Sequence, residues 1–222
     1  DRLLYRRYIN CRNCGFCPFS FERTSTFSNL FRIYFRTIGT TKFVCCVSKI
    51  NICLKFFRLN LVTGATGIIG SHVLLSLLQK EKVVVACKQK NSDVSKVETL
   101  FSYYTKNSKE LFQKIKWVEI DLNDTLLLEQ TLDGIETVYH CAGFVSFNKH
   151  HRKKLFEINE TGTKNLVNAC LYKGIKAFCH VSSISTINNL DYTQTLNEDV
   201  FWKTSGKESD YAISKYGAEK EV

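Results

Sequence analysis

The 222-residue sequence contains no methionine and no long apolar run. Without methionine, the chain shows no ordinary start residue. The best apolar candidate, Phe43–Phe57, is interrupted by Lys49 and Lys55. No run reaches the roughly 18 residues that a membrane-spanning helix needs, and no signal-peptide layout opens the chain. We therefore expect neither a membrane span nor a secretory leader.

Acidic residues are scarce in the first part of the chain, and arginine is scarce in the rest. Residues 1–58 hold 11 Lys and Arg but 2 Asp and Glu, a net charge of +9, whereas residues 59–222 carry a net charge of +1. The overall net charge of +10 therefore comes almost entirely from residues 1–58, and a nucleic-acid partner is not expected for residues 59–222. The composition, 44% apolar and 23% charged, excludes wholesale disorder. The contrast predicts two joined sequences that meet near residue 59.

The basic, Cys- and Phe-rich extension of residues 1–58 has no sustained period of 2 or 3.6 residues. Cys11, Cys14 and Cys17 have the spacing of an iron–sulfur or zinc site, but a fourth ligand does not follow closely. No metal is therefore predicted. A basic arm that binds nucleic acid is a further interpretation. We favour a segment that is not native protein or is disordered, because a reading frame extended upstream gives such an abrupt change.

Strand-like and helix-like patterns alternate from residue 59 onward. The expected strands are Leu59–Thr63, Lys82–Cys87, Lys116–Ile120, Glu136–Cys141 and Lys176–Ser182. The expected helices are Ile68–Gln79, Asp93–Thr105 with Ser92 or Asp93 as its cap, Asp124–Leu132, Arg152–Lys173 with Gly174 as its C-terminal cap, and one starting near Ser209. This alternation predicts an α/β fold with a doubly wound parallel sheet, the Rossmann fold. Ligands bind such sheets beyond the carboxyl ends of the strands.

A glycine-rich turn, TGATGIIG from Thr63 to Gly70, lies between the first strand and the first helix. Gly64 permits the tight turn, Gly67 lets the backbone approach a pyrophosphate, and Gly70 allows close packing of helix on strand. The helix N-terminus adds free N–H groups and a partial positive charge. The strand before the turn and the helix after it are the context that a dinucleotide site requires. The predicted contacts are Gly64, Thr66, Gly67, Ile68, Ile69 and Gly70.

This turn resembles the cofactor turn of the short-chain dehydrogenase/reductase superfamily, in its extended, epimerase-like branch. The resemblance covers residues 59–222. It implies further cofactor contacts after the third and fourth strands, namely Asp121, Leu122, Cys141, Ala142 and Gly143. Asp121 would bind the adenine amine. Asn159 matches a family asparagine that stabilises the sheet and the active site, while His140 and Cys141 are interpreted as structural residues.

The second strand is followed by lysines where many NAD enzymes have an acid. It ends in Cys87-Lys88-Gln89-Lys90, and the first acid is Asp93. An acid at this place holds the ribose 2′-hydroxyl of NAD. Lys88 and Lys90 would instead accept the 2′-phosphate of NADP, so NADP is preferred over NAD. The alternative is that both lysines are solvated loop charges.

Tyr211 and Lys215 form a Tyr-x-x-x-Lys pair at the start of the last helix. Their i,i+4 spacing places both on one helix face. A nearby ammonium lowers the pKa of a phenol from about 10, so that Tyr211 can exchange a proton with substrate. A hydroxyl that stabilises the reacting oxygen completes the set. Resemblance to dihydroflavonol-reductase-like and 3β-hydroxysteroid-dehydrogenase-like members favours Ser183 over Ser182 and Ser185.

These features predict an NAD(P)-dependent oxidoreductase that transfers hydride to or from a ketone or secondary alcohol. One alternative is a nucleotide-sugar epimerase or dehydratase with tightly bound NAD, and a second is a non-catalytic dinucleotide-binding module. The resemblance implies a sixth strand and a C-terminal substrate region, which do not follow Lys215 in these 222 residues. We therefore expect a truncated chain whose activity is reduced or lost.

The expected partners follow from the same resemblance. They are a small carbonyl, alcohol or nucleotide-sugar substrate and a second copy of the chain in a homodimer, without nucleic acid or membrane. The cysteines after residue 58 are Cys87, Cys141, Cys170 and Cys179. Because they fall in or beside expected buried elements, they suit reduced thiols in the cytoplasm better than a disulfide framework.

Overall fold

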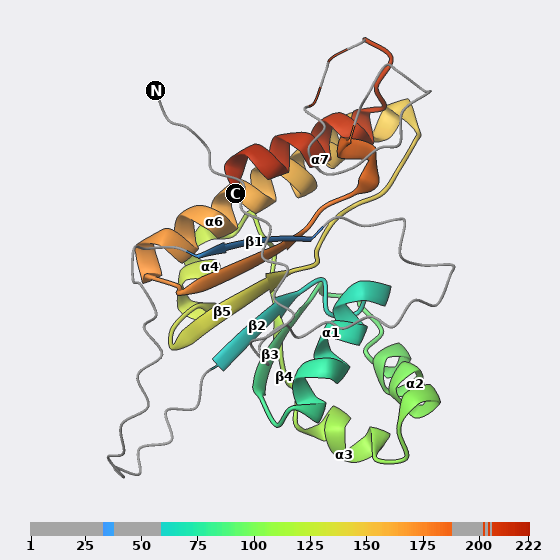
Figure 1. Ribbon diagram of the computed structural model, residues 1–222, viewed down its shortest axis with the longest axis vertical. Coiled ribbons are helices and arrows are strands. Elements are labelled where there is room, and N and C mark those ends of the chain that lie inside the picture. The colour runs from blue at the N-terminus through green and yellow to red at the C-terminus, as the bar shows by residue number, and fades with distance from the viewer. Residues whose placement is uncertain (1–32, 38–58, 188–201, 203, 205) are drawn as a thin grey trace, which may run out of the picture.

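The computed structural model describes residues 33–37, 59–187, 202, 204 and 206–222 (Figure 1). Its centre is a six-stranded sheet in the order β1-β6-β5-β2-β3-β4. The strands are β1 (Ile33–Thr37), β2 (Leu59–Thr63), β3 (Val83–Lys88), β4 (Lys116–Glu119), β5 (Ile135–His140) and β6 (Ala177–Val181). Strands β2 to β6 pair in parallel, whereas β1 pairs antiparallel with β6.

Helices cover both faces of the sheet, with α1, α2 and α3 on one face and α4, α6 and α7 on the other (Figure 1). The α-helices are α1 (Ile68–Gln79), α2 (Ser95–Tyr104), α3 (Ser108–Gln113), α4 (Thr125–Thr131), α5 (Arg152–Phe156), α6 (Gly162–Lys173) and α7 (Asp210–Glu221). The 3-10 turns η1 (Lys149–His151) and η3 (Ile184–Thr186) and the π-helical segment η2 (Glu157–Thr161) complete the elements. The predicted doubly wound parallel sheet is confirmed.

Side-chain alternation along the central strands builds one core on each face. Val62 and Val84 pack with α1 and with Phe101 of α2, while their neighbours Leu61 and Val85 point to the opposite face. Because both faces are covered, apolar side chains point to both sides of these strands, as in β3, whereas Asn60 is a buried polar residue within β2. The fold thereby fixes the strand ends, and with them the loops that carry the predicted site.

Most predicted element boundaries agree with the structure to within one or two residues. Gly174 ends α6 with a left-handed φ of +68°, as its role as a C-terminal cap requires. The predicted helix over Asp93–Thr105 starts later, at Ser95, and Asp93 accepts the Ser95 N–H at 3.0 Å from a position before the helix. Helix α3 was not predicted, because its six residues, SKELFQ, are too few to show a clear period.

Strand β1 lies within the extension, where no regular period predicted an element. Its backbone pairs Ile33 with Val181 and Thr37 with Ala177 at the edge of the sheet. The remainder of the extension, including Cys11, Cys14 and Cys17, lies outside the described residues, as does most of the predicted polar loop that follows η3. A boundary near residue 59 stays a prediction. In the described part of the chain, no helix is long and apolar enough to cross a membrane.

Candidate functional site

The carboxyl ends of β2, β5 and β6 meet at one edge of the sheet. Register aligns Thr63 with His140, and His140 with His180. The glycine turn, the Cys141–Gly143 loop and the serines after β6 therefore begin side by side. The structure brings the predicted cofactor turn and the predicted catalytic serine to the same edge, as the sequence implied.

The glycine turn is closed to side chains on one side and open on the other. Gly64 has φ +63°, and a Cβ there would lie 2.6 Å from the backbone of Ala142. A Cβ on Gly70 would overlap the carbonyl oxygen of Gly64. Gly67 is exposed and is the N-cap residue of α1, with no side-chain cap hydrogen bond. An open helix N-terminus free of Cβ atoms suits a pyrophosphate, so these residues fit a dinucleotide.

Asn159 ties the loop after β5 to helix α7. Its Oδ1 accepts the Phe144 N–H at 2.7 Å, and its Nδ2 donates to the Phe144 carbonyl at 2.9 Å and to Ser214 Oγ at 3.0 Å. Asn159 is the central residue of the π-helical segment η2, which interrupts the single helix predicted over 152–173. Such segments are frequent at functional sites. The geometry matches the stabilising role that the resemblance implied.

His140 is fully buried and has a determined tautomer. Thr163 donates its only hydroxyl proton to the Asn159 carbonyl at 2.5 Å, so His140 Nε2 must donate to Thr163 Oγ1 at 2.9 Å. His140 Nδ1 then accepts from Thr63 Oγ1 at 2.7 Å, and Thr63 Oγ1 accepts the Ala142 N–H at 3.3 Å. Burial lowers the pKa of His140 to about 3. The ring links Thr63 to Thr163, and its interpretation as a structural residue stays a prediction.

Tyr211 and Lys215 are both buried on α7, one turn apart. Lys215 Nζ donates to the Val181 carbonyl at 2.9 Å, and it lies 4.0 Å from the place a Cβ on Gly143 would take. Burial lowers the pKa of Lys215 to about 8. The ring of Tyr211 meets the exposed Phe147 edge to face at 6.1 Å. Both predicted residues therefore lie close to the loops that follow β5 and β6.

The serines after β6 differ in what their hydroxyls do. Ser182 Oγ donates to Glu219 Oε1 of α7 at 2.7 Å, so its hydroxyl proton is used in a bond between the end of β6 and α7. Ser183 Oγ accepts from the backbone N–H and the hydroxyl of Ser185, at 3.2 and 2.8 Å. Its own proton is not used in either bond. The turn η3 that follows Ser183 contacts α7 through Thr186, whose Oγ1 donates to Glu219 Oε1 at 2.6 Å.

The end of β3 carries an ion pair that the sequence did not predict. Lys88 Nζ lies 3.1 Å from Glu119 Oε2 at the end of the neighbouring strand β4. Lys90 is exposed two residues later. Asp121 is also exposed, and its Oδ1 accepts the backbone N–H of Asn123 at 2.9 Å. Lys88 would have to leave Glu119 in order to bind a 2′-phosphate.

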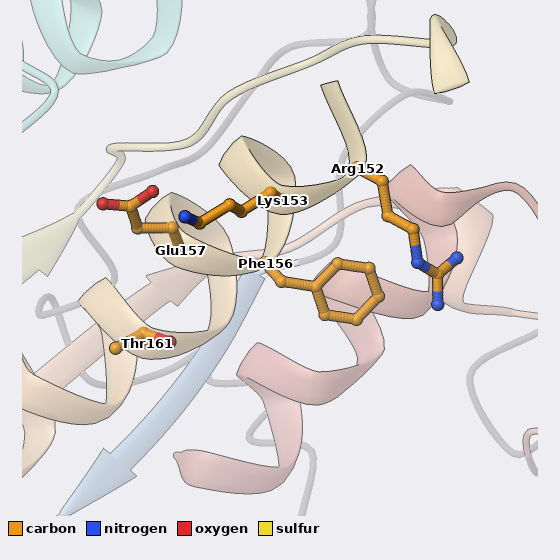
Figure 2. A pocket seen from close by; sticks show the side chains of 5 residues that line it. All are labelled: Arg152, Lys153, Phe156, Glu157 and Thr161. Atoms are coloured by element: carbon orange, nitrogen blue, oxygen red, sulfur yellow. The ribbon is translucent and has the colours of Figure 1, made fainter. Parts of the chain in front are cut away.

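A surface pocket of about 490 Å³ lies on the exposed side of α5 and η2 (Figure 2). Arg152 and Phe156 point to one side of the helix, and Lys153 and Glu157 to the other (Figure 2). The Arg152 guanidinium lies 5.0 Å above the Phe156 ring and pairs with Asp210 at the start of α7. None of the pocket residues belongs to the predicted site.

Several residues of the site were missed or undervalued from the sequence. Thr63, Thr163 and Glu219 hold the predicted residues in place, while His180 contacts Lys215. The available signal was the pair of histidines that interrupt the apolar strands VYHC and FCHV just before their ends. A polar residue inside a buried strand needs a partner, and register alignment of the two strands makes the histidines neighbours.

Known proteins resemble the chain from residue 60 to its last residue. Residues 60–222 match the model of the NAD dependent epimerase/dehydratase family. The chain is 30% identical over 164 residues to sterol demethylase protein B of Methylococcus capsulatus, covering 73% of this chain and 45% of that protein. It is also 30% identical over 162 residues to a putative dihydroflavonol 4-reductase of Synechocystis, covering 72% of this chain and 43% of that protein.

Solved structures show the same arrangement of elements. UDP-glucuronic acid 4-epimerase from Bacillus cereus, in complex with NAD, is 26% identical with a TM-score of 0.57, covering 74% of this chain and 50% of that one. UDP-glucose-4-epimerase from Stenotrophomonas maltophila, with bound NAD, is 24% identical with a TM-score of 0.59, covering 73% and 47%. The chain thus spans half or less of the length of these relatives.

Proposed function

Because the chain belongs to the NAD dependent epimerase/dehydratase family, we propose that it forms the dinucleotide-binding and catalytic part of an NAD(P)-dependent oxidoreductase. Its substrate is a ketone or a secondary alcohol. The observation that carries the proposal is the position of Tyr211 and Lys215. Both are buried on α7, and Lys215 lies beside Gly143 at the carboxyl ends of the strands.

Each residue has a role that follows from its surroundings. The exposed N-terminus of α1 and the loop of Cys141, Ala142 and Gly143 hold the dinucleotide, which supplies hydride transfer when bound. The Lys215 ammonium stabilises the Tyr211 phenolate and orients the ribose. Tyr211 gives a proton to the reacting oxygen or takes one from it, and the Ser183 hydroxyl donates a hydrogen bond to the same oxygen.

Substitution of Tyr211 by phenylalanine tests the catalytic assignment. Tyr211→Phe removes only the hydroxyl, so we expect dinucleotide binding to persist and turnover of carbonyl substrates to fall by roughly 100-fold or more. Tyr216→Phe is the matched control on the same helix, where the ring stacks on Trp202 at 4.5 Å. Equal activity of the two variants would overturn the catalytic role. In a chain extended to the length of its relatives, dinucleotide binding without turnover would instead favour the non-catalytic module.

The proposed cofactor preference is NADP over NAD. It rests on Lys88 and Lys90 at the end of β3 and on the lack of an acid at that strand end. In the pair of Lys88 with Glu119 the side chains are 23% and 49% exposed, and exposed pairs contribute little free energy, so we expect a phosphate to displace the carboxylate. We expect Glu119→Gln to strengthen NADPH binding and leave NADH binding unchanged. Tighter binding of NADH by the unaltered chain contradicts the preference.

A nucleotide-sugar epimerase or dehydratase remains the alternative, favoured by the 26% identical UDP-glucuronic acid 4-epimerase with NAD. An epimerase would retain NAD through purification, whereas a reductase would oxidise added NADPH with carbonyl substrates. Absorbance of nucleotide released from the denatured chain separates the two. Sterols and dihydroflavonols, which the names of the two relatives contain, are the first substrate classes to assay.

We further propose a homodimer and a cytoplasmic setting. Cys87, Cys170 and Cys179 are free and buried, and burial raises the pKa of the Cys87 and Cys170 thiols to about 12. Protonated, inaccessible thiols support a reduced protein. Light scattering of the purified chain tests the dimer, and a monomeric mass at micromolar concentration argues against it.

A further inference from the structure

His180 is a buried histidine for which the proposed chemistry has no use. It lies on β6 one residue before Val181, and its side chain is fully inaccessible. Its Nε2 lies 3.4 Å from Lys215 Nζ. Its ring centroid lies 5.2 Å from that of His140, its register neighbour on β5.

The contact with Lys215 determines the tautomer of His180. A protonated lysine only donates hydrogen bonds, so His180 Nε2 must present its lone pair and Nδ1 must carry the proton. Nδ1 has no hydrogen-bond partner among the described residues. A buried donor without a partner is costly. The contact with Lys215 therefore costs free energy, because the Nδ1–H of His180 is buried without an acceptor in the part of the chain that the structure describes.

The Lys215 ammonium has two hydrogen-bond acceptors among the described residues. One N–H goes to the Val181 carbonyl and one to His180 Nε2. Its third N–H has no acceptor within the described ranges, and the ammonium lies beside Gly143. The titratable groups around it are Tyr211 and Glu219 on its own helix, Cys141 and His140 at the end of β5, and His180 on β6. His140 is engaged at both nitrogens by threonines, which leaves His180 as the imidazole that serves Lys215.

We propose that His180 is a positioning residue for Lys215: its Nε2 lone pair holds the buried ammonium protonated and aims the remaining N–H toward the Gly143 loop. This inference rests on the proposed function, because the loop is where the dinucleotide ribose would lie. His180 itself touches neither cofactor nor substrate. It stays neutral because burial and the Lys215 charge both lower its pKa.

The first test needs no cofactor. The 222-residue chain is prepared with ¹³Cε-labelled lysine, and the Lys215 signal is assigned with Lys215→Arg and followed against pH by NMR. His180→Gln can place an acceptor near Nε2, whereas His180→Asn is too short to reach Lys215. We expect the Asn variant to lose the Lys215 proton about one pH unit lower than the unaltered chain, and the Gln variant to titrate close to it. Equal midpoints in all three chains overturn the proposal.

The second test connects the pair to binding. Dinucleotide affinity is measured by fluorescence at pH 6 and pH 8.5. A one-unit shift of Lys215 makes His180→Asn lose roughly tenfold more affinity than the unaltered chain between these pH values, and His180→Gln restores the normal ratio. A loss equal at both pH values indicates a merely structural role and contradicts the proposal. If no chain binds a dinucleotide while the NMR shift is present, the proposed function fails and the His180–Lys215 coupling stands.

Discussion

Lys215 is a charged residue held in a buried place, and this has a measurable cost at the residue scale. Its pKa is lowered from 10.5 to about 8 by burial. The folded chain therefore binds the proton more weakly than the unfolded chain does. The penalty is fully present below pH 8 and is relieved as the pH rises from about 8 toward 10.5.

Replacing this lysine should accordingly stabilise the fold. We expect Lys215→Met to raise the free energy of unfolding by about 1–3 kcal/mol at pH 7, with the gain shrinking as the pH approaches 10. Lys220→Met, at an exposed position of the same helix, is the control and should change little. Urea unfolding at pH 7 and pH 9.5 provides the measurement. A destabilised Met variant would show that the Lys215 hydrogen bonds outweigh its desolvation.

Two glycines of the turn have different expected roles: Gly70 affects stability, and Gly67 affects dinucleotide binding. A Cβ at position 70 overlaps the Gly64 carbonyl, whereas one at position 67 meets only that oxygen, at 3.3 Å. We expect Gly70→Ala to cost about 1–3 kcal/mol of stability. Gly67→Ala should leave the thermal midpoint nearly unchanged while weakening dinucleotide binding, because the methyl group projects where the backbone is exposed. Thermal unfolding and dinucleotide titration of both variants measure the split, and equal losses of stability would contradict it.

At the scale of elements, the interruption of the helix over 152–173 connects the loop after β5 to helix α7. Apolar spacing predicted one continuous helix, and the five-residue π-helical segment η2 within it left no mark in that spacing. The segment turns Asn159 inward, where its side chain makes three hydrogen bonds to Phe144 and Ser214. Loop and helix α7 are thereby joined through one side chain.

Loss of this side chain should be costlier than loss of an ordinary buried amide. We expect Asn159→Ala to reduce stability by about 2–4 kcal/mol, because two backbone groups of Phe144 lose their partner. Asn165→Ala is the matched control on α6, where the side chain makes one bond, to the Leu122 carbonyl at 3.1 Å. Its expected cost is about 1 kcal/mol. Similar losses measured by urea unfolding would mean that Asn159 adds nothing beyond an ordinary hydrogen bond.

The strands and the long helices could be predicted because their signals are local. β-branched runs such as Val83–Val85 and the glycine turn after Thr63 mark their own ends. What could not be predicted depends on contacts between distant residues. The Lys88–Glu119 pair needs the register of β3 with β4, and the separate uses of Ser182 and Ser183 need Glu219 from α7. Strand β1 depends on pairing with an edge 140 or more positions away in the sequence, which no local pattern reveals.

At the scale of the whole molecule, the net charge of +9 on residues 1–58 has little bearing on the site, which lies in residues 59–222 with a net charge of +1. The described sheet is organised instead around two neutral histidines, His140 and His180, which lie side by side in its interior. Their pKa values are lowered, for His140 to about 3, chiefly by burial. In the unfolded chain each takes up a proton near pH 6.5, so the unfolded state gains protons first as the pH falls.

The fold should therefore weaken in mild acid, before most carboxylates are protonated. Stability that is present above pH 6.5 is lost as the pH falls, for His140 down to about pH 3, with a slope of about 1.4 kcal/mol per pH unit for each histidine. Urea midpoints between pH 7.5 and pH 5 measure this slope. We expect His140→Gln to lower stability at pH 7.5 yet reduce the slope by about half, because one buried proton acceptor is gone. His150→Gln, at an exposed position, should leave the slope unchanged. A slope that is the same in all three chains would mean that the paired histidines do not control the acid response of the molecule.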